Sequence, residues 1–238
     1  MKKNIPSLRD LKINVIIPAF NEEESIANVI EAIPSFVEDI IVVSNQSTDN
    51  TENEAKKAGA TVLTEANKGY GFACLKGINY LQKKDIKPEI VVFLDGDFSD
   101  YPEELPKLIE PIYLQNFDFV IGARVKNRRE NGSMTIPQIF GNWLATFLMK
   151  VLYSAKFSDL GPFRAIRYEK LLELNMKDKT YGWTVEMQLK ALKHQLKYTE
   201  VAVSYRNRIG TSKVSGTING AIMAGIKIIG WIIKYRAK

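Results

Sequence analysis

The first half of the chain alternates short apolar segments with amphipathic segments, and this alternation constrains the fold more than any other feature. The apolar segments, rich in Val and Ile, are typical of strands buried on both faces and lie at residues 12–18, 39–44, 61–65, 89–94 and 118–123. Between them, Ile26, Val29, Ile30 and Ile33 show helical spacing. Further helices are expected at 49–58, 72–81 and 105–112. The pattern predicts an α/β fold with a mostly parallel sheet flanked by helices.

The second half reads differently, with helices expected at 136–154, 184–193 and 214–235 and strands at 163–166 and 200–205. The 238 residues suffice for one large α/β domain. We expect a single domain over residues 1–213, in which the second half completes the site of the first, and a C-terminal amphipathic basic helix over residues 214–238. Cys74 is the only cysteine, which excludes an intrachain disulfide and fits a reducing cytosol.

Positive charge gathers at the C-terminal end. No Asp or Glu follows Glu200, and the seven Lys and Arg residues after it outweigh the net charge of +6 of the whole chain. Such asymmetry favours an anionic partner, either membrane phospholipid or a phosphorylated substrate, with a solvated basic helix as the alternative. Nucleic acid is disfavoured, because the residues between these charges are mainly Ile and Gly rather than stacking aromatics.

The C-terminal segment has the pattern of a helix that lies on a membrane surface. Lys227 interrupts its apolar run before the ~20 residues that a spanning helix needs. One stripe of the expected helix consists of Ile218, Ile222, Ile226, Ile229 and Ile233, with lysines opposite and Trp231 at the border. Packing of this stripe on the protein's own core is the alternative. Because the first residues do not resemble a signal peptide, we expect a cytoplasmic protein, peripheral on the inner face of the cell membrane.

Polar motifs follow four of the expected strands. They are Pro18-Ala19-Phe20-Asn21-Glu22, Ser44-Asn45, Asp95-Gly96-Asp97 and Gly122-Ala123-Arg124. In a parallel sheet, ligands bind beyond the carboxyl ends of the strands. Asp95 and Asp97 can face one hard cation such as Mg²⁺ or Mn²⁺, although a plain Asp-Gly turn has the same sequence.

A glycine-containing turn with Lys68 and Gly69 joins the third strand to a helix, where backbone N–H groups can approach an anion. The dinucleotide fingerprint G-x-G-x-x-G and the Walker motif are both absent from the sequence, which argues against a dehydrogenase and against a P-loop phosphotransferase.

These motifs, together with Asp159-Leu160-Gly161-Pro162-Phe163-Arg164, Glu186 and Arg208-Ile209-Gly210-Thr211-Ser212-Lys213, resemble those of the family 2 glycosyltransferases. The resemblance covers roughly residues 13–213 and is closest to the dolichyl-phosphate mannosyltransferase and polyprenyl-phosphate glycosyltransferase branch. It implies a GT-A fold, inverting transfer of a hexose from a nucleotide-sugar donor, a divalent metal and a polyprenyl-phosphate acceptor.

The resemblance also implies roles for individual residues. Pro18, Phe20, Glu22, Ser44, Asn45, Lys68, Gly69, Asp95, Asp97 and Arg124 would bind the nucleotide sugar, and Asp97 would be the direct metal ligand beside Asp95. Phe163, Arg164, Arg208, Ser212 and Lys213 would serve the acceptor and the phosphates. A hydroxyl acceptor needs a base, for which Glu186 and Asp159 are candidates, whereas a phosphate acceptor needs none.

One departure concerns the second strand, where the family usually has two aspartates and this chain has Ser44-Asn45. The donor base, whether uridine, guanosine or thymidine, therefore stays open, as does the oligomeric state. Two alternatives also stay open: the same fold acting on a soluble or saccharide acceptor, and an inactive protein that binds nucleotide sugars.

Overall fold

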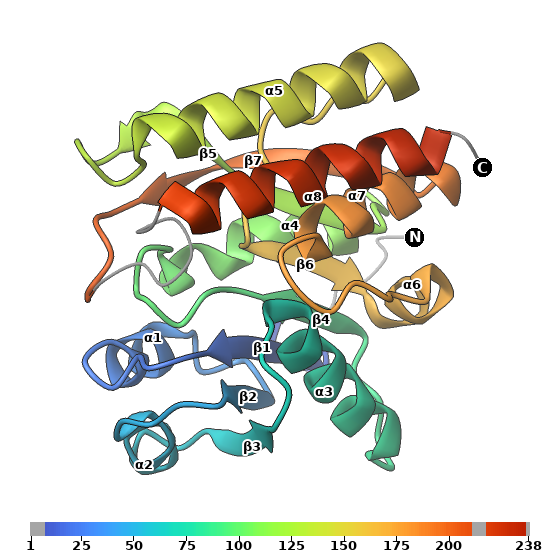
Figure 1. Cartoon of the computed structure of the whole chain (residues 1–238). Coiled ribbons are helices and arrows are strands. Elements are labelled where there is room, and N and C mark those ends of the chain that lie inside the picture. Colours follow the sequence, from blue (N-terminus) through green and yellow to red (C-terminus); the bar gives the residue numbers. More distant parts are fainter. Residues whose placement is uncertain (1–7, 211–217, 237–238) are drawn as a thin grey trace, which may run out of the picture.

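Seven strands form one sheet in the computed structural model, which describes residues 8–210 and 218–236 (Figure 1). They are β1 (Ile13–Ala19), β2 (Asp39–Asn45), β3 (Thr61–Glu65), β4 (Ile90–Phe93), β5 (Phe119–Arg129), β6 (Arg164–Arg167) and β7 (Tyr198–Tyr205). Their order across the sheet is β3-β2-β1-β4-β6-β5-β7. The strands of the second half thus extend the sheet of the first, and the predicted mostly parallel α/β fold is confirmed.

Strand β6 is the exception to the parallel arrangement, because it runs antiparallel to both β4 and β5. The pairs β1–β2, β2–β3, β1–β4 and β5–β7 are parallel. Strand β5 was expected to end at residue 123, but Lys126, Arg128 and Arg129 also lie in it. This strand extends beyond the expected end because β7 pairs with it again at Arg129, after a shift in register.

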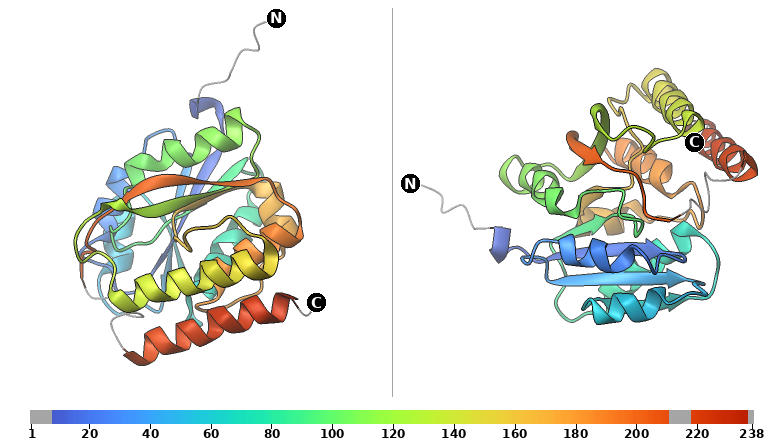
Figure 2. Two further views of the ribbon diagram at one scale, coloured as in Figure 1. Left: turned by 90° about the horizontal axis from the view of Figure 1, so that it is seen from above. Right: turned by 90° about the vertical axis from the view of Figure 1, so that its left-hand side faces the viewer.

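The described helices cover both faces of the sheet (Figure 2). They are α1 (Ile26–Ala32), α2 (Thr51–Lys57), α3 (Tyr70–Lys83), α4 (Leu105–Leu114), α5 (Ile136–Tyr153), α6 (Tyr168–Leu174), α7 (Trp183–Lys193) and α8 (Ile218–Arg236), with short 3₁₀ helices η1 (Leu8–Asp10) and η2 (Pro102–Glu104). Helix α6 was not expected, because seven residues are too few for a clear period. Residues 214–217, the start of the expected C-terminal helix, lie outside the described residues.

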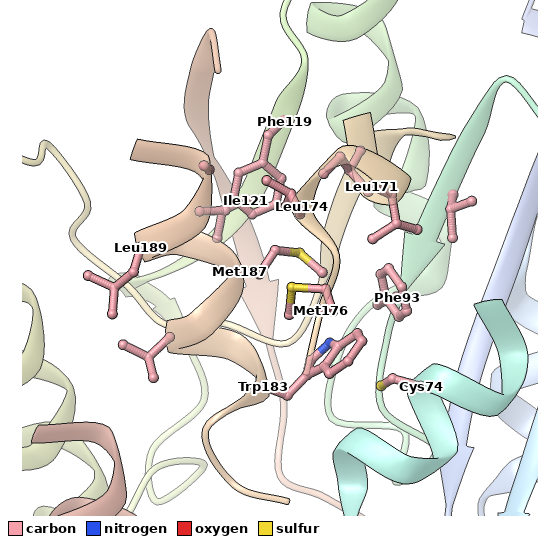
Figure 3. Close-up of a cluster of buried hydrophobic side chains, with 14 of the residues drawn as sticks. Cys74, Phe93, Phe119, Ile121, Leu171, Leu174, Met176, Trp183, Met187 and Leu189 are labelled. Atoms are coloured by element: carbon pink, nitrogen blue, oxygen red, sulfur yellow. The ribbon is translucent and has the colours of Figure 1, made fainter. Parts of the chain in front are cut away.

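Alternate residues of the central strands enter two different cores. In β1, Ile16 packs with α3 and α7 on one side, while Val15 and Ile17 pack with α1 and α4 on the other. Figure 3 shows the first core, where Trp183 of α7 meets Phe93 of β4 with ring centroids 5.9 Å apart. The double-sided burial explains why these strands read as continuous apolar runs.

Helix α8 lies beside α5 on the outside of the first core (Figures 1 and 2). Ile232 is fully buried there, and Trp231 Nε1 donates to Asp178 Oδ2 over 2.6 Å. Of the expected apolar stripe, Ile226 and Ile233 stay exposed. The helix therefore packs on the domain through the side opposite to these two residues. No helix within the described ranges is both long and apolar enough to cross a bilayer.

Candidate active site

The turn after β4 holds Asp97 in a fixed orientation at the carboxyl edge of the sheet. Its Oδ1 accepts hydrogen bonds from the Ser99 backbone N–H over 3.0 Å and from Ser99 Oγ over 2.5 Å. Phe98 adopts a positive φ of 60° in this turn. Oδ2 of the nearly buried carboxylate remains for a cation.

Arg208 supplies that cation in this structure. Its Nη1 lies 3.1 Å from Asp97 Oδ2, and its Nη2 lies 3.0 Å from Glu22 Oε1. The motifs after β1 and β4 and the segment after β7 thus meet at one guanidinium. The sequence predicted a shared edge for the first two, whereas Arg208 was a candidate through the family resemblance.

The segment after β7 is fastened along the Asp97 turn by its backbone. The N–H of Ile209 donates to Asp97 O over 3.0 Å, and the N–H of Arg206 donates to Ser99 O over 2.9 Å. The Arg206 guanidinium carbon also lies 3.5 Å from the centre of the Phe98 ring. Arg206 was not among the candidate residues, although it belongs to the basic segment noted in the sequence.

Two further carboxyl groups, those of Asp95 and Asp100, are buried close to Asp97. Burial and the neighbouring Asp97 charge raise the pKa of Asp95 to about 7. Burial and the charges of Asp95 and Asp97 raise the pKa of Asp100 well above its ordinary value. Asp95 Oδ1 and both Asp100 oxygens are buried with no hydrogen-bond partner among the described residues. Asp100 was not among the candidate residues, although its position as a third aspartate three residues after Asp97 is visible in the sequence.

The oxygens of Asp97 and Asp95 fit a hard divalent cation. Such an ion would offset the crowding of carboxyl groups that raises the pKa of Asp95, and would give the buried Oδ1 of Asp95 a partner. Within the described ranges, however, no three His, Cys, Asp or Glu side chains are grouped to hold a metal by themselves. The protein would supply only Asp97 and Asp95, so the other ligands would come from a bound phosphate group, as is usual for Mg²⁺.

The turn before α3 is joined to the end of β2 by Asn45. Asn45 Oδ1 accepts from the Gly69 N–H over 2.6 Å, and Asn45 Nδ2 donates to Asn67 O over 2.6 Å. Gly69 has a φ of +148°, and a Cβ there would lie 2.2 Å from Lys179 O. Asn45 therefore shapes the turn rather than offering a free amide.

Other candidate donor residues lie around this turn. The Lys68 ammonium lies 4.7 Å from the centre of the Phe20 ring, which brings these two candidates together. Ser44 is fully buried, and its Oγ has no hydrogen-bond partner among the described residues. Pro18 is buried within β1.

Arg124 and Asp159 form a nearly buried ion pair. Asp159 Oδ2 accepts from the backbone N–H and from Nε of Arg124, both over 2.8 Å, and Oδ1 accepts from Nη2 over 2.7 Å. Burial alone would raise the pKa of Asp159, but the Arg124 guanidinium outweighs it and holds the pKa below its ordinary value. Asp159 is therefore a weak base.

Glu186, the other candidate base, has no exposed surface. Its carboxylate accepts from the N–H groups of Lys177 and Asp178, at distances between 2.7 and 3.1 Å, and pairs with Lys190 Nζ over 2.8 Å. These contacts hold the 177–178 segment, whose neighbour Lys179 touches the Gly69 turn. Glu186 is thus placed to position that segment.

Phe163 and Arg164 are also fully buried. Arg164 donates to the carbonyl groups of Leu160 and Thr184, over 3.1 and 3.0 Å, and so joins the Asp159 loop to the start of α7. Ser212 and Lys213 lie outside the described residues.

The comparisons with known proteins assign the chain to a family. Residues 14–174 match the model for glycosyl transferase family 2. The chain is 33% identical over 215 residues to an uncharacterized glycosyltransferase of Mycobacterium tuberculosis, covering 89% of this chain and 94% of the relative. The protein therefore belongs to glycosyl transferase family 2, in agreement with the resemblance found in its motifs.

Two further similarities concern proteins with named activities. A UDP-N-acetylglucosamine–dolichyl-phosphate N-acetylglucosaminyltransferase of Methanococcus voltae is 29% identical over 219 residues, which cover 82% of this chain and 86% of the relative. A crystal structure of glucosyl-3-phosphoglycerate synthase from Mycobacterium tuberculosis, in complex with Mn²⁺, UDP-glucose and phosphoglyceric acid, superposes with a TM-score of 0.78 at 20% identity, covering 100% of this chain and 85% of that one. The second similarity confirms the GT-A fold.

Proposed function

We propose that this protein is an inverting hexosyltransferase that uses a nucleotide-sugar donor, a divalent cation and a polyprenyl-phosphate-type acceptor. The single observation that carries the donor part is the meeting of Asp97, Glu22 and Arg208 at the carboxyl edge of the sheet. A diphosphate bound there would complete the ligands of a cation on Asp97 and Asp95. The Methanococcus voltae relative, whose name includes both a UDP-sugar and dolichyl phosphate, supports the same donor and acceptor classes.

The proposal of a phosphate acceptor rests on the contacts of the two candidate bases. Asp159 is locked to Arg124, and Glu186 is buried among backbone donors and Lys190. Neither is placed to take a proton from a sugar hydroxyl. An acceptor phosphate is already anionic and needs no base, so catalysis would consist of positioning and charge stabilisation.

The proposed reaction is a single displacement. An oxygen of the acceptor phosphate attacks the anomeric carbon and forms the new bond, while the bond from that carbon to the donor diphosphate breaks and the nucleoside diphosphate leaves with the electron pair. A divalent cation would neutralise the charge that grows on this leaving group. Arg208, released from Asp97 when the cation binds there, would contribute a second positive charge to the diphosphate.

The acceptor class is tested by transfer from a radiolabelled nucleotide sugar to two acceptors, polyprenyl phosphate and phosphoglyceric acid. The proposal predicts label in the organic phase with polyprenyl phosphate and little with phosphoglyceric acid. Label transferred only to the soluble acceptor would replace the lipid acceptor with the alternative that the crystal structure of the synthase represents.

We expect Arg208→Ala to lower kcat/KM by about 10²-fold, the cost of losing one charge-stabilising donor. The side chain is partly exposed, and its ion-pair partners among the described residues, Glu22 and Asp97, lie at the rim, so the melting temperature should change little. Arg128→Ala removes a more exposed arginine outside the site and serves as the control. An unchanged rate together with a lowered melting temperature would show that Arg208 is structural.

We also expect loose discrimination between donor bases. Both the Nδ2 and the Oδ1 of Asn45 are hydrogen-bonded to the turn before α3, and Ser44 has no carboxylate to accept a hydrogen bond from a base. The measurement is the ratio of kcat/KM for the UDP- and GDP-linked forms of one sugar. A ratio above ~10⁴ would require a buried hydrogen bond dedicated to one base, and would contradict this expectation.

A further inference from the structure

Helix α5 presents a continuous apolar side to solvent. Of its eight exposed residues, only Lys150 is polar. The largest of the others are Ile136, Ile139, Phe140, Trp143, Phe147 and Val151, which recur every three or four residues. Val151 is 61% exposed and Trp143 is 56% exposed. A surface helix of a soluble domain ordinarily shows its polar face here, so this side of α5 needs a partner.

The same side of the molecule continues on α8. Helix α5 buries Ala145 and Met149 in the first core, and α8 buries Ile232 in that same core. The opposite sides of both helices therefore point away from it, and α8 shows Ile226 and Ile233 there. The two helices are also bonded to each other, because the Tyr153 hydroxyl and the Arg236 guanidinium donate to carbonyl groups across the contact.

The charge of this surface selects the partner. Helices α5 and α8 contain no Asp or Glu, and Lys150, Lys234 and Arg236 are exposed on them. A second copy of the chain would bring these cations against their own equivalents with no acidic residue between them. An anionic bilayer instead offers hydrocarbon for the apolar side and phosphate for the cations, with about 1 kcal/mol for each basic residue near the leaflet.

We propose that the outer side of α5 and α8, called here the α5–α8 face, binds anionic membranes, with the aromatic residues of α5 entering the lipid interface. This inference deepens the proposed function and rests on it for its purpose, since a polyprenyl-phosphate acceptor lies in a membrane. It assigns the main apolar contact to α5, which the sequence did not single out, with α8 as its neighbour.

The α5–α8 face is connected to the proposed acceptor side of the site. Asn142 of α5 donates through Nδ2 to Ser158 O over 3.2 Å, and its Oδ1 accepts from the Leu160 N–H over 2.8 Å. The two residues bonded to Asn142 lie on either side of Asp159 in the sequence, and Asp159 pairs with Arg124. Docking through α5 would therefore hold the Asp159 loop near the lipid surface.

The test is co-sedimentation of the full chain with vesicles of phosphatidylcholine alone and of equal parts phosphatidylcholine and phosphatidylglycerol. Binding to the anionic vesicles is expected at low salt, and Trp143→Ser should weaken it about tenfold, as expected for the loss of one large apolar side chain. Ile86→Ser, which removes a similarly exposed isoleucine outside α5 and α8, should leave binding unchanged. Added salt should release the protein.

Three outcomes would overturn the inference: no binding to anionic vesicles, equal binding of the Trp143→Ser variant and the native protein, or a concentration-dependent dimer that this variant dissociates. None of these measurements involves turnover. A failure of the α5–α8 face is therefore distinguishable from a failure of the proposed transferase reaction, which is followed in the same preparations by the release of nucleoside diphosphate from a nucleotide sugar.

Discussion

Asp97→Asn should lower kcat by about 10³-fold, which corresponds to about 4 kcal/mol of lost charge stabilisation in the transition state. The substitution removes the charge that would bind the divalent cation but keeps the shape and a side-chain oxygen for the bonds from Ser99. Asp97 lies at the rim of the sheet, so the melting temperature should stay close to that of the native protein. The measurement is initial rate against metal concentration for both proteins.

Asp85→Asn is the matched control, because Asp85 is an exposed carboxylate outside the site. It should retain the native rate and the native metal dependence. If Asp97→Asn turned over donor at the native rate in the presence of a chelator, the assignment of Asp97 to the metal would be wrong.

Asp159→Ala should have the largest effect on stability, lowering the free energy of unfolding by about 3–5 kcal/mol. It would leave the Arg124 guanidinium uncompensated, with only 12% of its side chain exposed, and would remove the acceptor of the Arg124 backbone N–H. Urea denaturation measures the loss. The double variant Arg124→Met, Asp159→Leu removes both charges and should recover part of it.

The same pair gives an acid dependence. Because the native pKa of Asp159 is lowered, its contribution to stability is fully present above the ordinary aspartate pKa and is lost as pH falls through the lowered value. The stability difference between the native protein and Asp159→Ala should therefore shrink on acidification. A difference that is independent of pH would contradict the ion pair.

The sequence predicted the central strands closely, because burial on both faces leaves a simple signal, whereas the end of β5 was missed. In β4 every residue is apolar, as is the middle of β2, and the boundaries of both strands shift by at most one residue at either end. Strand β6 was also located, but its antiparallel direction was not, since four residues carry no record of which neighbours they pair with. Direction and order depend on contacts between distant segments.

The candidate site, too, could be predicted from the sequence only in part. Motifs at strand ends predicted that Asp97 and Glu22 share one edge, because parallel strands bring their carboxyl ends together. Arg208 was a candidate only through the family resemblance. The sequence could not show that Asn45 is bonded to the turn before α3, or that Glu186 is sealed beneath the 177–178 segment. These engagements depend on backbone N–H groups, whose positions no local motif specifies. The sequence also could not show that one side of α5 is exposed, because an apolar helix has the same sequence pattern whether or not another element covers it.

The most direct test of the account is the release of nucleoside diphosphate from a panel of UDP-, GDP- and dTDP-sugars by the native protein, with polyprenyl phosphate present, first with Mn²⁺ or Mg²⁺ and then with a chelator. We expect release with at least one donor, no release after chelation, and recovery when the metal is restored. Binding of a nucleotide sugar without any release would instead identify an inactive binding protein, and release that persists in the chelator would contradict the metal site at Asp97.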